Sequence, residues 1–459
     1  MGVEYLGLSE INGSFVVLEG VEGVAFEEAV SFKAGGKTAQ GQVVLVSEDR
    51  VVVQVFEGTE EFSLDNTNAR FLGKPMEIRL STEILGRVFD GTGRPVDGLP
   101  PVYAECRSDI NGKPINPISR VYPRNFIQTG ISAIDGLTTL IRGQKLPIFT
   151  GNGLANDKLA AQIVSQASLG EGSNEKFVIV FAAMGIKHDA ADFFRRTFEE
   201  SGVTGKVVMF LNLAGDPVME RIITPKAALT ASEYLAYEKN MHVLTILTDM
   251  TSYAEALREI SSAKGEIPGR KGYPGYLYSE LAGIYERAGI VNGGRGSHTL
   301  LPILTMPNDD ITHPIPDLTG YITEGQIVLD RNLHLKNIYP PISILPSLSR
   351  LMKDGIGAGY TREDHPDCAY QLFSSYAKAN EVRALASVIG EEELSETDKK
   401  YMRFGRALEE KFLNQGYYEN RRITETLELG WEILGELPES ELDRVSEKHL
   451  RKYYKAKEL

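Results

Sequence analysis

Residues 126–158 read FIQTGISAIDGLTTLIRGQKLPIFTGNGLANDK, and this stretch decides the fold of the central part of the chain. Within it, residues 146–150 form a short apolar run of strand type, and a turn containing two glycines follows. The chain then continues with apolar residues at helical spacing. A strand, a glycine turn and a helix in this order form the frame of a phosphate-binding loop, in which backbone N–H groups and the helix dipole face an anion. We call residues 151–158 the glycine loop.

The side chains that grip a phosphate are missing from this frame. When the pattern G-x-x-x-x-G-K-S/T is counted from Gly151, Asn156 takes the place of the second glycine, Asp157 that of the lysine and Lys158 that of the hydroxyl residue. Counting from Gly153 does not restore the lysine either. We expect Asp157 to cap the following helix and to fill the phosphate position with its own carboxylate. The glycine loop is therefore predicted not to bind Mg-ATP in the usual way.

Length and composition limit the class of protein. A chain of 459 residues suggests about three domains, and its 42% hydrophobic and 24% charged residues are typical of a globular protein. A net charge of −14 argues against a nucleic-acid partner. Cys106 and Cys368 lie far apart, and the histidines show no metal-ligand spacing, so we expect neither a disulfide nor a metal site. No apolar run approaches the roughly 20 residues that span a bilayer, so we expect no membrane insertion.

The sequence pattern changes twice along the chain. Residues 1–72 contain short β-branched runs between turns, which predicts a small β-barrel or sandwich. In residues 73–355, nearly continuous apolar strands alternate with amphipathic helices, which predicts a parallel sheet that is buried on both faces. Residues 356–459 show helical patterns alone and are predicted to form a helical domain, with a last helix from residue 439 to the end. The predicted central strands are 146–151, 177–185, 206–214, 242–250 and 300–306.

Further segments of note are PKAALTASEYLAYE (225–238), DMTSYAEALREIS (249–261), IPDLTGYITEGQI (315–327) and PSLSRL (346–351). Together with residues 127–149, they resemble the α/β-type subunits of rotary ATPases, in the order of that family and over essentially the whole chain. Within the family the similarity is greatest to the non-catalytic B subunit of V/A-type ATPases. The resemblance implies an N-terminal β-barrel, a central RecA-like domain and a C-terminal helical bundle. It also implies a ring in which three A and three B subunits alternate around a rotor.

The residues that hydrolysis requires are absent from the matching positions. This fold needs a lysine at the phosphates, a hydroxyl on Mg²⁺ and a carboxylate that positions the attacking water. Catalytic relatives carry that carboxylate in a G-E-R sequence, and here Gly185-Ile186-Lys187 stands at its position. We therefore expect no ATP hydrolysis by the isolated chain. Asp249 takes the place of the Walker B aspartate, and a helix cap or a retained fold element is the favoured role over magnesium binding.

Arg350 matches the position that supplies an arginine finger in the family. Such a finger reaches the γ-phosphate held by a neighbouring subunit, and a guanidinium group offers a planar fork of donors for phosphate oxygens. Ser347, Leu348 and Ser349 are assigned to the same nucleotide interface. The alternative is an arginine that is solvated or ion-paired within its own loop.

Further assignments follow from the resemblance. The segment GEEELSETD (390–398) is similar to the loop that contacts the central rotor stalk, although an acidic run by itself is usually solvated. The residues assigned to rotor contact are Glu391, Glu392, Glu393 and Glu396. We expect the N-terminal domain to hold the peripheral stalk. ATP or ADP with Mg²⁺ is expected at the subunit interface, held mainly by the A subunit and not by the glycine loop. The complex would lie in the cytoplasm, peripheral to the inner membrane.

Two other functions stay open on the sequence. One is a self-sufficient RecA-like ATPase, such as a secretion motor or an RNA translocase. Asp157 and Ile186 argue against it, and the net charge of −14 argues against binding RNA. The other is a scaffold with an empty pocket at each interface. It differs from a non-catalytic B subunit that donates an arginine finger in the effect of changing Arg350. Tyr417 and Tyr418 are expected to pack in the core or at an interface, with adenine contact as the alternative.

Overall fold

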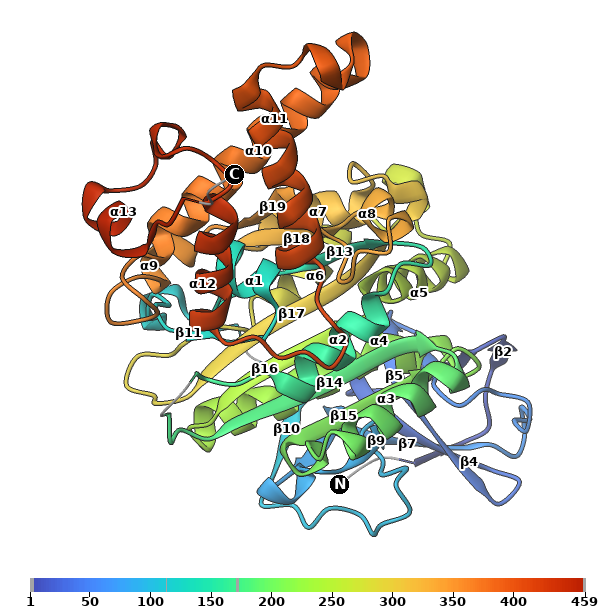
Figure 1. The fold of residues 1–459 in the computed structure, drawn as a ribbon. Coiled ribbons are helices and arrows are strands. Elements are labelled where there is room, and N and C mark those ends of the chain that lie inside the picture. Colours follow the sequence, from blue (N-terminus) through green and yellow to red (C-terminus); the bar gives the residue numbers. More distant parts are fainter. Residues whose placement is uncertain (1–3, 113, 171–172, 457–459) are drawn as a thin grey trace.

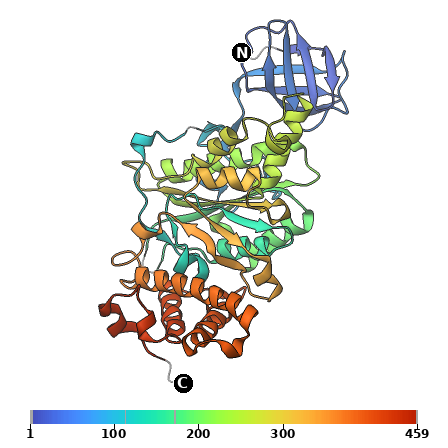
Figure 2. The ribbon, with the colours of Figure 1, turned by 90° about the horizontal axis from the view of Figure 1, so that it is seen from above.

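The computed structural model describes residues 4–112, 114–170 and 173–456, and it consists of three parts (Figure 1). A curled antiparallel sheet is followed by a mainly parallel eight-stranded sheet covered by helices, and then by a group of helices. Figure 2 shows the curled sheet and the helical group at opposite ends of the central part. The predicted fold class is thereby confirmed.

The N-terminal β-barrel is a seven-stranded antiparallel sheet with the order β1-β7-β4-β5-β6-β3-β2. Its strands are β1 (Glu4–Leu6), β2 (Glu10–Asn12), β3 (Phe15–Glu19), β4 (Glu28–Ala34), β5 (Lys37–Val46), β6 (Arg50–Val55) and β7 (Asn68–Pro75). The two edge strands, β1 and β2, are joined by residues 7–9 alone, so the sheet curls back on itself. Its concave side buries Val16, Phe32 and Val53. This curling protects edges that would otherwise be open to pairing with another chain.

The central sheet has the order β19-β18-β13-β17-β16-β14-β15-β9, and its neighbours are parallel except for the antiparallel pair β18–β19. Its strands are β9 (Val88–Asp90), β13 (Ile148–Gly151), β14 (Phe177–Ile186), β15 (Val207–Leu213), β16 (His242–Thr248), β17 (Ser297–Met306), β18 (Gly325–Leu329) and β19 (Ile342–Ser349). The five predicted strands correspond to β13 and β14 to β17 and are confirmed. Pro346 lies inside β19, which tolerates a proline because it is an edge strand.

Helices bury both faces of this sheet, because successive strand residues point to opposite sides. Ile179 and Phe181 of β14 join the apolar core under α2 and α3, whereas Val178 and Val180 join the core under α4 and α5. The helices of this part are α1 (Ser132–Leu137), α2 (Asn156–Gln166), α3 (His188–Glu200), α4 (Val218–Glu233), α5 (Met250–Ala263), α6 (Leu277–Tyr285), α7 (Pro314–Ile322), α8 (Arg331–Leu335) and α9 (Met352–Gly355). Two short strand pairs, β8 (Glu77–Leu80) with β10 (Cys106–Asp109) and β11 (Phe126–Ile127) with β12 (Leu140–Ile141), lie outside the main sheet.

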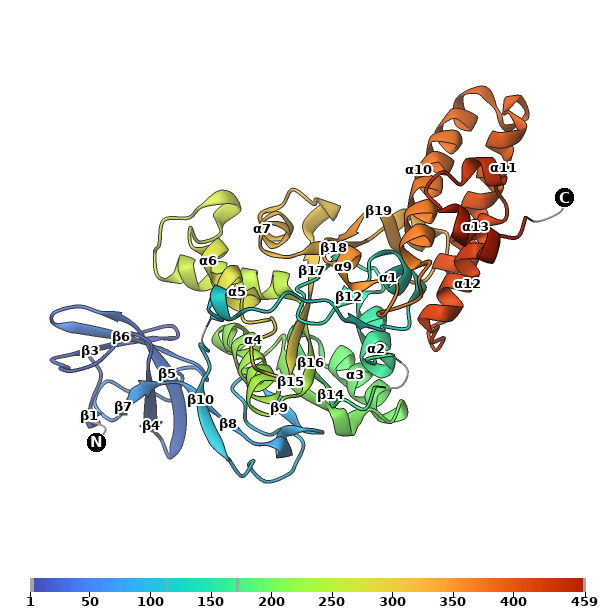
Figure 3. The same ribbon diagram turned by 90° about the vertical axis from the view of Figure 1, so that its left-hand side faces the viewer.

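The C-terminal part consists of α10 (His365–Ile389), α11 (Glu396–Ala407), α12 (Ile423–Leu434) and α13 (Glu447–Tyr453). Figure 3 shows the hairpin of α10 and α11 at the end of the molecule opposite to the barrel. The predicted helix from residue 439 onward is wrong over most of its length, and its residues 457–459 lie outside the described residues. Leu442 and Val445 are buried there, and the N–H of Arg444 donates to Gln371 Oε1 at 2.9 Å. These contacts hold the segment before α13 in a non-helical path.

Charged groups join the barrel to the central part. Glu57, just after β6, accepts a hydrogen bond from the Arg94 guanidinium, which follows β9. Glu220 lies beside this ion pair in the first turn of α4 and is only 7% exposed. Burial, together with the charges of Asp90, Asp216 and Glu57, raises the pKa of Glu220 to about 7.

We expect the stability of the chain to fall with rising pH because of Glu220. Between about pH 4.5 and 7 the folded state binds a proton that the unfolded chain has released, so unfolding becomes easier as the pH rises through this window. A Glu220→Gln variant lacks this titration. Folding raises the pKa from 4.5 to about 7, and one pKa unit corresponds to about 1.4 kcal/mol, so the variant should be about 3 kcal/mol more stable than the parent at about pH 8 and nearly equal at about pH 4.5. Urea unfolding at both values measures this difference, and a difference that does not depend on pH would contradict it.

Candidate functional site

The glycine loop leaves β13 at the carboxyl edge of the sheet and enters α2. The N–H of Asn156 donates to the carbonyl of Leu154 at 2.9 Å, and the N–H of Leu159 donates to the carbonyl of Ala155 at 3.0 Å. Ala155 therefore holds the N-cap position, and Asp157 lies inside the first turn. The prediction that Asp157 caps this helix is wrong, because the tight turn begins the helix two residues earlier.

Two carboxylates lie close together beside the glycine loop. Burial raises the pKa of Asp157, and the nearby charge of Asp249 raises it further. Asp249 is the N-cap of α5, accepting the N–H of Thr251 at 2.8 Å, and it also accepts Thr305 Oγ1 at 2.5 Å. The helix-cap interpretation of Asp249 is thus confirmed. A triphosphate would add negative charge where two carboxyl groups already repel each other.

An ion pair from the neighbouring strands fastens the glycine loop. Asp309 follows β17 and Arg331 follows β18, and these strands flank β13 in the sheet. Arg331 Nε donates to Asp309 Oδ2 at 2.7 Å, and Arg331 Nη2 donates to the Asn152 carbonyl at 3.0 Å. A Cβ atom at Gly151 would lie 1.9 Å from Asp309 Oδ1, so the pair can approach only a glycine there. Neither charged residue is among those predicted, although charges just after parallel strands were an available signal.

The remaining positions of the glycine loop, and the end of β14, the next strand of the central sheet along the chain, provide no catalytic group. Ile186 ends β14 and packs against the apolar core. Its side chain cannot orient a water molecule. Lys158 is exposed, and Gly153 has a φ of 78° with open space around it.

Two predicted interface residues, Ser347 and Ser349, are buried and use their hydroxyl groups within the chain. Ser347 Oγ accepts the N–H of Val328 at 2.9 Å, and Ser349 Oγ donates to the carbonyl of Thr139 at 2.9 Å. Both are less than 10% exposed. They fasten the edge strand β19 to β18 and to the residues before β12.

Leu348 and Arg350 face the other way, as alternation along a strand requires. Leu348 is 48% exposed, and Arg350, immediately after β19, is also exposed. The backbone N–H of Arg350 donates to the carbonyl of Glu324 at 3.0 Å. Across the part of the chain that the structure describes, no carboxylate or carbonyl partners the Arg350 guanidinium. An uncompensated, permanently charged group at a sheet edge is therefore open to a neighbouring molecule.

Three family models match the chain in succession. Residues 8–73 match the "ATP synthase alpha/beta family, beta-barrel domain", residues 130–349 the nucleotide-binding domain of the same family, and residues 354–454 the "C-terminal domain of V and A type ATP synthase". The V-type ATP synthase beta chain 2 of Clostridium tetani is 63% identical, over 99% of both chains. The B subunit of the A-type ATP synthase of Aeropyrum pernix is 58% identical, over 98% of this chain and 97% of that one.

The chain belongs to the B subunits of V- and A-type ATP synthases. A solved structure supports the fold: the ATP synthase subunit NeqB of Nanoarcheaum equitans has a TM-score of 0.74 and 39% identity, and the match covers 93% of this chain and all of that one. The chain is therefore a component of a rotary ATP synthase, and other subunits of that complex are its partners.

In this B-subunit chain the predicted rotor-contact residues lie at the tip of the α10–α11 hairpin. Gly390 ends α10 with a φ of 89°, and Ser395 caps α11 by accepting the N–H of Asp398 at 3.1 Å. The four glutamates between and beside these residues are all exposed, namely Glu391, Glu392, Glu393 and Glu396. Glu391 pairs with Arg406 at 3.1 Å, and Glu396 pairs with Lys399 at 2.9 Å.

An aromatic group lies near α2. Tyr417 packs between Tyr339 and Tyr418, with ring centroids 6.1 and 4.8 Å away. Tyr339 Oη donates to Gln162 Oε1 on α2 at 2.9 Å. Tyr417 therefore packs as expected, whereas Tyr418 is 85% exposed.

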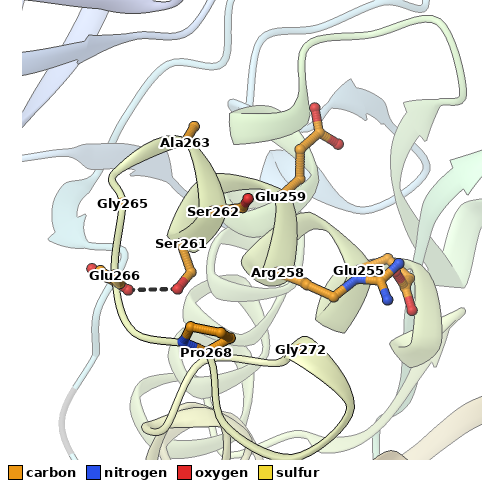
Figure 4. A pocket seen from close by; sticks show the side chains of 10 residues that line it. All are labelled: Glu255, Arg258, Glu259, Ser261, Ser262, Ala263, Gly265, Glu266, Pro268 and Gly272. Carbon is orange, nitrogen blue, oxygen red and sulfur yellow. Dashed lines mark hydrogen bonds and ion pairs between the residues drawn. The ribbon is translucent and has the colours of Figure 1, made fainter.

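A solvent-open pocket of about 770 Å³ lies near the C-terminal end of α5 (Figure 4). Three carboxylates line it, those of Glu255, Glu259 and Glu266, and the last accepts a hydrogen bond from Ser261 at 2.7 Å. The one arginine in its wall, Arg258, is paired with Glu255. The 14 residues of α5 rise about 21 Å, which separates most of this wall from Asp249. The acidic lining does not suit a nucleotide.

The described part of the chain offers neither a metal-binding cluster nor a membrane-spanning helix. In residues 4–112, 114–170 and 173–456, acidic, histidine and cysteine side chains form no group of three or more that could hold a metal ion. No helix in those ranges is both long enough and apolar enough to cross a membrane.

Proposed function

We propose that this B subunit is non-catalytic and donates Arg350 in trans to an ATP site held mainly by a catalytic A subunit. The observation that carries the proposal is the combination of an exposed, unpaired Arg350 with a glycine loop that lacks every phosphate-gripping side chain. ATP or ADP with Mg²⁺ would then bind at the subunit interface. A guanidinium group supplied from the neighbouring chain stabilises the charge that develops on the transferred phosphoryl group.

The remaining parts fit a ring in which three A and three B subunits alternate. The acidic tip of the α10–α11 hairpin would contact the central rotor stalk, and the barrel would hold the peripheral stalk. Nucleotide-driven opening and closing at the interfaces would move the helical part and turn the rotor. ATP hydrolysis or synthesis is coupled in this way to H⁺ or Na⁺ transport, with the ring in the cytoplasm at the inner face of the membrane.

We expect the isolated chain to show no ATP turnover above a protein-free blank. Asp157 and Asp249 would repel the phosphates, and Lys158, the one lysine of residues 151–158, stands at the hydroxyl position and is exposed. Phosphate release is to be measured for the isolated chain, for the A subunit alone and for the assembled ring of both. Turnover by the isolated chain would overturn the proposal and favour a self-sufficient ATPase. Turnover that requires both chains would support it.

A further inference from the structure

Glu324 contacts the backbone of Arg350 and connects it to the residues before β13. Its carbonyl accepts the N–H of Arg350 at 3.0 Å and Gln144 Nε2 at 3.1 Å. Its carboxylate accepts the N–H of Lys145 at 2.8 Å and lies 2.9 Å from Lys145 Nζ. Glu324 thus connects the backbone of the exposed arginine to two consecutive residues just before β13, an interior strand of the sheet.

Lys145 is itself held firmly in place by burial and by two ion pairs. Its side chain is only 5% exposed, and its Nζ also lies 2.9 Å from Glu286 Oε1. The next residue, Leu146, donates its N–H to the carbonyl of Leu300 on β17 at 3.0 Å, so the backbone of this segment is part of the sheet. A buried ammonium group that two carboxylates share, on a backbone held by strands, has little freedom to move.

Close backbone packing extends the fixed position of Lys145 and Glu324 to Arg350. Gly325 has a φ of 128°, and a Cβ atom there would lie 2.0 Å from the carbonyl oxygen of Leu348. The start of β18 is therefore in close contact with the end of β19. Gln144 Nε2 also donates to Ser349 Oγ at 2.9 Å, so the residues on both sides of the contact share one support. Movement of Glu324 would displace Arg350 as well.

We propose that Lys145 and Glu324 are positioning residues for Arg350. Their ion pair fixes the backbone from which the guanidinium group extends, so that the charge is in place before nucleotide binds in the neighbouring subunit. The two residues act through Arg350 and do not touch nucleotide themselves. This inference rests on the proposed role of Arg350.

A double-mutant cycle in the assembled ring tests the inference. Lys145→Met, Arg350→Ala and the double variant are each combined with the A subunit, and steady-state ATP turnover is measured. We expect Lys145→Met to lower kcat by about 10²-fold, the loss that a misplacement of about 1 Å can cause, with little change in KM. In the Arg350→Ala background the same substitution should cause no further loss, because its effect passes through the missing guanidinium group.

The controls separate positioning from stability. Arg87 and Asp97 form a comparably buried pair, 12% and 11% exposed, beside β9 at the opposite edge of the same sheet. Arg87→Met should lower the melting temperature of the chain without lowering kcat. If Lys145→Met prevents ring assembly, Glu324→Gln replaces it, since this half-buried residue keeps its shape and loses its charge.

Each outcome has a separate meaning. An unchanged kcat in the Lys145 or Glu324 variant, or a loss that adds fully to that of Arg350→Ala, would overturn the positioning role. Unchanged turnover in Arg350→Ala alone would instead overturn the proposed function of the arginine.

Discussion

Arg350→Ala should reduce ATP turnover of the assembled ring by about 10³–10⁵-fold, the range measured for arginine fingers in GTPases. The side chain is exposed and unpaired among the described residues, so its removal costs the fold nothing that the structure shows. It would remove the positive charge that meets the developing phosphoryl charge. Ring assembly and nucleotide binding are expected to persist, because the A subunit supplies most contacts to ATP. The measurement is kcat together with nucleotide affinity in the same preparation.

Two further variants make this result specific. Arg350→Lys keeps the charge but loses the planar fork of donors, so we expect it to recover only part of the lost turnover. Arg451→Ala is a matched surface control, because Arg451 is an exposed arginine of α13 in an i,i+4 pair with Glu447. It should leave kcat unchanged. Turnover of Arg350→Ala within a few-fold of the parent would support the scaffold alternative.

Arg287→Met is expected to lower the free energy of unfolding by about 3–5 kcal/mol, the loss typical of removing one partner of a buried ion pair. Arg287 is 2% exposed, and its Nε and Nη2 atoms donate to the Glu233 carboxylate at 2.6 and 2.7 Å. Its Nη1 donates to the carbonyl of Ile110 at 2.8 Å. The guanidinium group thereby joins α4, the segment after α6 and the segment after β10. Without the guanidinium group, the largely buried carboxylate of Glu233 loses its ion-pair partner.

A second substitution checks this cause. Glu233→Leu in the Arg287→Met background removes the stranded charge, and replacing a whole buried ion pair by apolar groups is often close to neutral. We therefore expect the double variant to regain a large part of the lost stability in urea unfolding. A double variant as unstable as Arg287→Met would show that packing, and not the unpaired carboxylate, causes the loss.

The glycine loop retains its fold although it has lost its phosphate ligands, and the structure gives a physical reason. β13 lies between β17 and β18 in the middle of the sheet, and Leu159 and Ile163 of α2 are fully buried beneath it. Removing the strand or the helix would open the core of the central part. Replacing the exposed and half-buried residues 156–158 leaves that core intact. Binding chemistry can therefore be lost while the strand–turn–helix frame is retained.

Local information in the sequence sufficed for much of this protein. Apolar runs and helical spacing identified β13 to β17 and the helical C-terminal part, because strand and helix periods are properties of neighbouring residues. The missing lysine of the glycine loop, Ile186 and the PSLSR segment with Arg350 could also be read residue by residue.

The tertiary structure alone decided which distant residues meet. Asn152 and Arg331, like Lys145 and Glu324, are 179 residues apart and come together because β13 lies next to β18 in the sheet. The tertiary structure also starts α2 at Asn156, ahead of the predicted cap Asp157. It leaves residues 443–446, which were predicted to be helical, outside a helix. Sheet order and burial determine these contacts, and no period along the chain encodes them.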